Sequence, residues 1–199
     1  MPAHDVDTPT RTKLLDAAEE LMLSRGYVAA SVDGICAAAG ATKGSFFHHF
    51  KSKEELGKVL LTRFAERQSS AFREACADLE DPLERVLRGI ERAIDAARDP
   101  GMRGCLVGTL AQEISETHPE LRDVCRTCFA EFVENVGRDL VAAKAQRGPD
   151  ADFDAEGLAT YFLAVAQGSM LLVRATGDRD AMARNLEHLG AHVRSLFER

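Results

Sequence analysis

Apolar residues recur every three or four positions along almost the whole chain, and no stretch alternates strictly between apolar and polar residues. The observed spacing is that of amphipathic helices, whereas strict alternation would indicate half-buried strands. Glycines, prolines and capping residues divide the pattern into segments. We therefore predict an all-α protein of about nine helices, near residues 10–25, 32–39, 43–49, 53–79, 82–98, 105–114, 119–146, 154–175 and 180–197.

The composition indicates a folded protein of a reducing compartment. Of 199 residues, 45% are hydrophobic and 29% are charged, which suits one or two compact domains. Five cysteines, an odd number, argue against a disulfide framework. The chain starts without a cleavable leader pattern and contains no run of about 18 apolar residues, so we expect a cytoplasmic protein with no membrane partner.

The charge distribution is uneven. A net charge of −7 argues against a general coat for nucleic acid. Between Gly40 and Arg63, however, there are five basic residues, two acidic residues and two histidines. This small cationic region on an acidic protein suits contact with a few phosphates.

Residues 31–56 contain the pattern that indicates function. They read SVDGICAAAGATKGSFFHHFKSKEEL, which predicts a capped helix, a turn with glycine, a second short helix and the start of a third. Two helices joined in this way form a helix-turn-helix. Its small core is predicted to consist of Ile35, Ala38, Phe46 and Phe50.

The outward residues of this motif have chemistry that suits DNA. Lysine can contact a guanine edge or a phosphate, glycine allows close approach to the bases, and hydroxyl and imidazole groups can reach phosphate oxygens. Free N–H groups at helix starts also favour phosphate. The candidate DNA contacts are Ser31, Thr42, Lys43, Gly44, Ser45, Phe47, His48, His49 and Lys53. The alternative is an ordinary helix pair with surface lysines and histidines.

The order of these residues closely resembles the signature of the TetR family, in which K-G-S, two aromatic residues and histidine precede K-x-K-E-x-L. The resemblance extends back to Arg11 and covers about residues 8–68, with the helix-turn-helix at about 31–50. It implies a DNA-binding domain at 8–68 and a ligand-binding and dimerisation domain at 69–199. It also implies a ligand-responsive repressor that binds palindromic double-stranded operator DNA as a homodimer. Phe47 departs from the tyrosine that is common there in the family.

The resemblance also implies where the partner subunit and a small-molecule effector of unknown identity bind. Dimerisation contacts are predicted on the last two helices, at Phe162, Val165, Gly168, Ser169, Leu172, Leu186, Leu189 and Val193. Candidate effector contacts combine aromatic, sulfur and polar character, at Cys105, Thr109, Gln112, Phe129, Phe132, Gln167 and Met170. Each of the latter is equally compatible with ordinary core packing.

Cys105 suggests an alternative hypothesis for how the protein is regulated. It is placed in the first turn of a helix beside Arg103, and a helix N-terminus and a cation both favour the reactive thiolate. The G-C-L sequence with Glu113 downstream is similar to a TetR branch that senses electrophiles or oxidants. The alternative function is therefore a redox- or electrophile-responsive repressor switched through Cys105. The simpler interpretation is a small residue packed at a tight corner.

Other function classes find little support. The sequence contains no P-loop, no G-x-S-x-G and no H-E-x-x-H, so we expect neither an enzyme nor a cofactor. Cys125 and Cys128 lack a second ligand pair, and His188 and His192 lack companions, so no metal site is expected. A third hypothesis is a helical binding protein that has lost operator binding, supported only by Gly34 within a helix and by Phe47.

Overall fold

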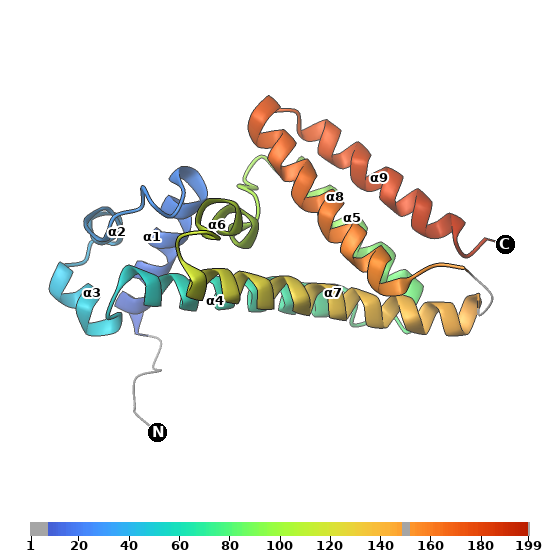
Figure 1. Ribbon diagram of the computed structural model, residues 1–199, viewed down its shortest axis with the longest axis horizontal. Helices are drawn as coiled ribbons and strands as arrows, with labels where there is room; N and C mark the ends of the chain where they lie inside the picture. Colours follow the sequence, from blue (N-terminus) through green and yellow to red (C-terminus); the bar gives the residue numbers. More distant parts are fainter. Residues whose placement is uncertain (1–7, 149–151, 199) are drawn as a thin grey trace, which may run out of the picture. The chain divides into compact units, whose positions relative to one another are not determined.

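The computed structural model describes residues 8–148 and 152–198, and within them the chain forms nine helices and no strand. The predicted all-α fold is confirmed (Figure 1). The helices are α1 (Pro9–Arg25), α2 (Val32–Ala39), α3 (Lys43–His49), α4 (Lys53–Ala75), α5 (Pro82–Arg98), α6 (Leu106–Ile114), α7 (Pro119–Arg147), α8 (Ala155–Thr176) and α9 (Arg179–Ser195).

Capping residues and glycines set the helix ends. The Thr8 hydroxyl accepts the N–H of Arg11 at the start of α1, at 3.3 Å. Gly26 and Gly177 end α1 and α8 with φ values of 85° and 75°, which residues with a Cβ rarely adopt. Cys105 is the N-cap of α6 and lies outside the helix, one residue from the predicted start.

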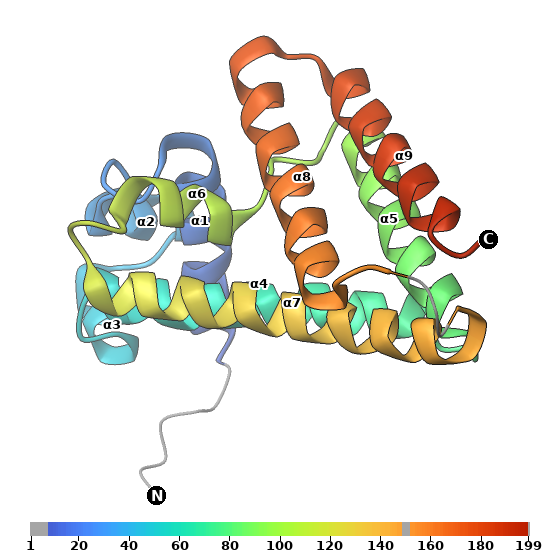
Figure 2. The ribbon, with the colours of Figure 1, turned by 45° about the vertical axis from the view of Figure 1, so that its right-hand side comes forward.

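The chain divides into two compact units, and the first comprises 8–67 and 103–128 of the described residues. It contains α1–α3, most of α4, α6 and the start of α7, with α6 beside α1 in both views (Figures 1 and 2). Ala38, predicted for its core, is exposed, because it lies about 200° around α2 from the buried Cys36. The unit's core includes Leu14, Ala18, Met22, Ile35, Phe46, Phe50, Leu56, Leu60 and Leu61.

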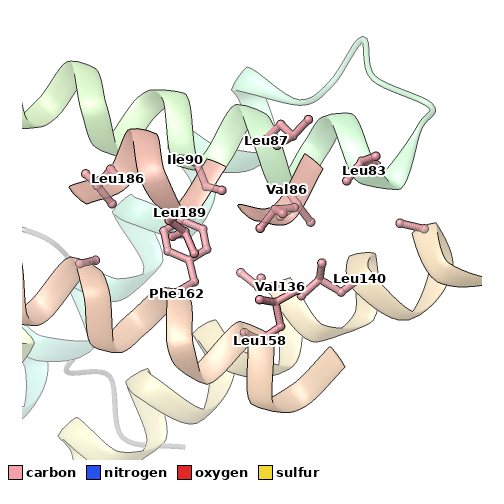
Figure 3. Close-up of a cluster of buried hydrophobic side chains, with 14 of the residues drawn as sticks. Leu83, Val86, Leu87, Ile90, Val136, Leu140, Leu158, Phe162, Leu186 and Leu189 are labelled. Atoms are coloured by element: carbon pink, nitrogen blue, oxygen red, sulfur yellow. The ribbon is translucent and has the colours of Figure 1, made fainter. Parts of the chain in front are cut away.

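The second unit comprises residues 68–102 and 129–198, apart from the undescribed 149–151. Its core is a cluster of aliphatic side chains around Phe162, drawn from α5, α7, α8 and α9 (Figure 3). Phe132 meets Phe162 edge to face, with the ring centroids 5.4 Å apart. Labelled members of the cluster are Leu83, Val86, Leu87, Ile90, Val136, Leu140, Leu158, Leu186 and Leu189.

Two arginines form several hydrogen bonds within this second unit. Arg85 binds one carboxylate oxygen of Asp139 through two nitrogens, at 2.6 and 3.0 Å. Arg179 donates to one main-chain carbonyl at the end of α5 and to three carbonyls between α5 and α6, at 2.9–3.5 Å. The segment 97–102 is thus held by one guanidinium at the start of α9.

Helix α8 is the one helix among the described residues that is long and apolar enough to cross a membrane by length and composition. A core helix passes the same test, and one face of α8 is buried within the second unit through Leu158, Phe162 and Ala166. Its apolar character is therefore accounted for in part by this core.

Candidate nucleic-acid interface

Helices α2 and α3 are joined by a tight turn at Gly40. This residue has a left-handed φ of 62°, and its N–H bonds to the Ala37 carbonyl at 3.3 Å. The next N–H, of Ala41, returns to the Cys36 carbonyl at 2.9 Å. The Thr42 hydroxyl then accepts the N–H of Ser45 and begins α3. Helix, glycine turn and second helix follow one another as predicted.

Helix α3 has one buried face and one exposed face. Phe46 is fully buried and the adjoining Phe50 is 2% exposed, so these two rings fix the helix to the unit's core. Phe47, by contrast, is 55% exposed. A large aromatic side chain on the outer face is available for contact with a sugar or a thymine methyl.

The polar candidates on α3 share this outer face. Lys43 and His48 are exposed, and Ser45 is half-buried. The Lys43 ammonium lies 2.7 Å from Asp33 of α2, an acidic partner that the sequence analysis missed. Both side chains are largely exposed, so the ion pair is weak and can exchange for a phosphate.

Two glycines of the motif differ in their surroundings. A Cβ at Gly34 would lie 3.3 Å from the Ser31 Oγ, which accepts the Gly34 N–H at 3.0 Å. The lack of a Cβ at Gly34 therefore leaves room for the Ser31 hydroxyl to cap the start of α2. A Cβ at Gly44 would meet only the Thr42 hydroxyl, at 3.7 Å, so no internal contact of the described residues demands a glycine there.

His49 lies at the inner edge of the α3 surface. Its Nε2 is 3.5 Å from the Thr8 hydroxyl, and it is half-buried. Burial, together with His48 and Arg11 nearby, lowers the pKa of His49 below the ordinary histidine value. Near neutral pH it is therefore uncharged and suits a hydrogen bond to phosphate better than an ion pair.

Lys53 has an internal role that differs from the predicted phosphate contact. Its ammonium donates to the Tyr27 carbonyl at 2.9 Å and lies 4.2 Å from the centroid of the Tyr27 ring. Burial lowers the pKa of Lys53, and the Glu113 carboxylate opposes part of that shift. The spacing K-x-K could not show this, because the partner lies 26 residues away in sequence.

The candidate effector contacts divide between the two units. Cys105, Thr109 and Gln112 belong to the first, and Phe129, Phe132, Gln167 and Met170 belong to the second. Thr109 is 8% exposed and donates to the Cys105 carbonyl, whereas Gln112 is exposed. Phe132 and Met170 pack beside the second unit's core. Their role toward an effector stays a prediction.

Cys105 is half-buried at the N-cap of α6, and its sulfur accepts the N–H of Gly108 at 3.5 Å. Its neighbour Arg103 lies 4.0 Å from Glu20. Cys125 is 2% exposed, and burial raises the pKa of its thiol to about 12, with Cys128 and Cys105 adding to the shift. Among the described residues no group of side chains forms a candidate metal site.

The candidate dimer contacts fall into two classes of burial. Gly168 and Leu172 are exposed on α8, and Val165 is half-buried. The other five are buried within the second unit, where they pack against the same chain: Phe162, Ser169, Leu186, Leu189 and Val193. Helical spacing alone does not distinguish an internal apolar face from one that meets a partner. Tyr161 and Leu171, which the prediction omitted, are exposed on α8.

A capped helix, a glycine turn and a second helix with an exposed polar face define the class of helix-turn-helix DNA-binding proteins. Residues 14–58 match the family model of the bacterial regulatory proteins of the tetR family. Residues 82–189, more than half of the chain, match the tetracyclin repressor-like C-terminal domain. The chain therefore belongs to the TetR family of transcriptional regulators, which are not enzymes.

Two transcriptional regulators and one solved structure are similar to this chain over most of their own length. The HTH-type transcriptional repressor DhaR of Mycobacterium sp. (strain GP1) is 28% identical over 96% of this chain and 92% of its own. The transcriptional regulator AcuR of Cereibacter sphaeroides is 30% identical over 79% of this chain and 73% of its own. The crystal structure of the regulatory protein TetR from Rhodobacter sphaeroides has a TM-score of 0.83 at 26% identity, over 93% of this chain and 99% of that one.

Gly44→Ala is expected to separate folding from DNA binding. Since alanine is the better helix former and a Cβ has room, the free energy of unfolding should rise by about 0.5–1 kcal/mol in urea denaturation. The same methyl obstructs close approach to the bases, so operator affinity measured by fluorescence anisotropy should fall about tenfold. Gly137→Ala in α7, where a Cβ also has room, is the control that should leave DNA affinity unchanged.

Lys43→Met and Lys53→Met should differ in the salt dependence of operator binding. Removing a phosphate contact lowers the slope of log K against log salt by about one. We expect that change for Lys43, whose ammonium is exposed, and not for Lys53, whose ammonium is held by Tyr27. Equal slope changes in the two variants would contradict the internal role of Lys53.

Proposed function

We propose that this protein is a ligand-responsive transcriptional repressor that binds a palindromic operator as a homodimer. The observation that carries the proposal is the two-faced helix α3, whose inner face is fixed by Phe46 and whose outer face presents Lys43, Phe47 and His48. The repressor assignment is supported by the relative DhaR, which is named as a transcriptional repressor. Its place of action is the cytoplasm, with no membrane partner.

A single reading helix contacts too few base pairs for specificity, whereas two helices related by a two-fold axis read a palindrome. The surface that supports dimerisation is the exposed apolar face of α8. Tyr161, Gly168 and Leu172 follow one another at helical spacing on that face, and Leu171 adjoins them. Leu171 and Leu172 are each 51% exposed. Exposed side chains of this size are typical of a surface that another subunit covers.

Ligand response is supported by the position of the candidate effector contacts along the chain. Thr109 and Gln112 lie on α6, a helix of the same compact unit as α2 and α3. An effector that contacts α6 more favourably in one conformation shifts the protein toward that conformation. The shift can be no larger than the effector's differential affinity for the two states.

Leu172→Arg tests the operator-bound dimer. Dimerisation would bury the introduced charge, so the variant should be monomeric in sedimentation experiments. Operator affinity should fall by about a hundredfold because the two heads no longer bind together. Val141→Arg on α7, at a side chain that is 60% exposed, is the matched control and should remain dimeric.

A DNase footprint completes this test of the proposed function. Wild-type protein should protect two half-sites related by a two-fold axis, about 34–36 Å apart or a multiple of that distance. A footprint on one half-site alone, or a Leu172→Arg variant that binds like the wild type, would refute the dimeric reading mode.

The second candidate function is a thiol switch at Cys105. It is favoured by one observation, the half-buried sulfur at the N-terminus of α6 that accepts the Gly108 N–H. N-ethylmaleimide should then release wild-type protein from the operator and leave Cys105→Ser bound. Release of both proteins to the same extent would eliminate this candidate.

A further inference from the structure

A carboxylate of α6 holds the loop that connects α1 to α2. The two oxygens of Glu113 accept the N–H of Tyr27 at 2.6 Å and the N–H of Val28 at 2.9 Å. The residues that meet here are 85 and 86 positions apart in sequence. Both carboxylate oxygens are therefore used on two consecutive main-chain groups, an arrangement that a neutral side chain cannot reproduce.

The loop is shaped to admit this carboxylate. Gly26 precedes the two amides with a left-handed φ of 85°. A Cβ on Gly26 would lie 2.5 Å from a Glu113 oxygen, closer than real Cβ contacts allow. Glycine at this position thus both ends α1 and leaves the space that the carboxylate occupies.

The same dipeptide is held from its other side by α4. Lys53, the first residue of α4, donates to the Tyr27 carbonyl at 2.9 Å and lies 3.5 Å from the Val28 carbonyl. Glu113 thus binds the two N–H groups, and Lys53 binds the two carbonyls. The Tyr27 carbonyl also accepts the N–H of Ala30, which directly precedes the α2 cap Ser31. The start of α2 is consequently tied to both contacts.

We propose that Glu113 is a positioning residue for operator recognition, whose carboxylate holds the α1–α2 loop and thereby sets the orientation of α2 and α3 for DNA. The amides of Tyr27 and Val28 form a carboxylate-binding site that Glu113 of α6 occupies. This inference rests on the proposed function, because it assigns Glu113 a role in operator binding.

Chemical rescue tests this role. Glu113→Ala should bind specific operator DNA about tenfold more weakly than wild type, the expected effect of losing charge-assisted hydrogen bonds, while its affinity for non-specific DNA stays the same. Sodium formate should restore operator affinity when compared with sodium chloride at equal ionic strength, because formate fits the vacated amide pair. Glu113→Gln should lose affinity without rescue, since its amide group still fills the space.

Glu116→Ala, an exposed glutamate just beyond α6, is the matched control and should bind as wild type in both salts. Unchanged operator affinity in Glu113→Ala would overturn the proposal. Equal losses of specific and non-specific affinity, with no response to formate, would also overturn it and indicate a merely structural role.

A second measurement separates this inference from the proposed function. If wild-type protein binds no specific DNA, the proposed function fails, and amide hydrogen exchange still tests the contact itself. Exchange at Tyr27 and Val28 should accelerate in Glu113→Ala and slow again in formate. Identical exchange in wild type and variant would refute the positioning role of Glu113.

Discussion

Helices of seven and eight residues are unstable alone in water, so α2 and α3 depend on contacts with the rest of their unit. Phe46, Phe50 and Ile35 supply those contacts and are almost completely buried. Because these residues pack in the core, the opposite face of α3 lies outside the core. The side chains on that face are therefore not constrained by core packing and can be polar, small or exposed.

The fold was largely predictable because its signals are local. The left-handed conformation that ends α2 favours glycine, which is found at Gly40, and Pro82 follows the capping residue Asp81. Helix ends can therefore be predicted from neighbouring residues. The side-chain roles were less predictable because they depend on distant partners. Lys53 was predicted to contact DNA, yet its ammonium donates to Tyr27 on the loop between α1 and α2. Glu113 was recognised only as part of a resemblance, and its contacts with two amides required the folded chain.

Burial on α8 and α9 shows the same limit of sequence interpretation. Leu186 and Leu189 share the apolar spacing expected of a subunit interface, but they complete the internal core of their own unit. The residues left exposed, such as Leu172, are fewer and lie on α8. A periodic apolar pattern specifies that a helix face is covered. It does not specify whether the cover is the same chain or another copy.

Arg179 shows how a contact can constrain length without constraining sequence. Its guanidinium binds the main-chain carbonyls of Ala97, Asp99, Pro100 and Met102. A substitution at an exposed position of the segment, such as Pro100, leaves its carbonyl in place, whereas an inserted or deleted residue moves the carbonyls out of register. The guanidinium therefore constrains the number of residues in this segment more than the identity of its exposed side chains.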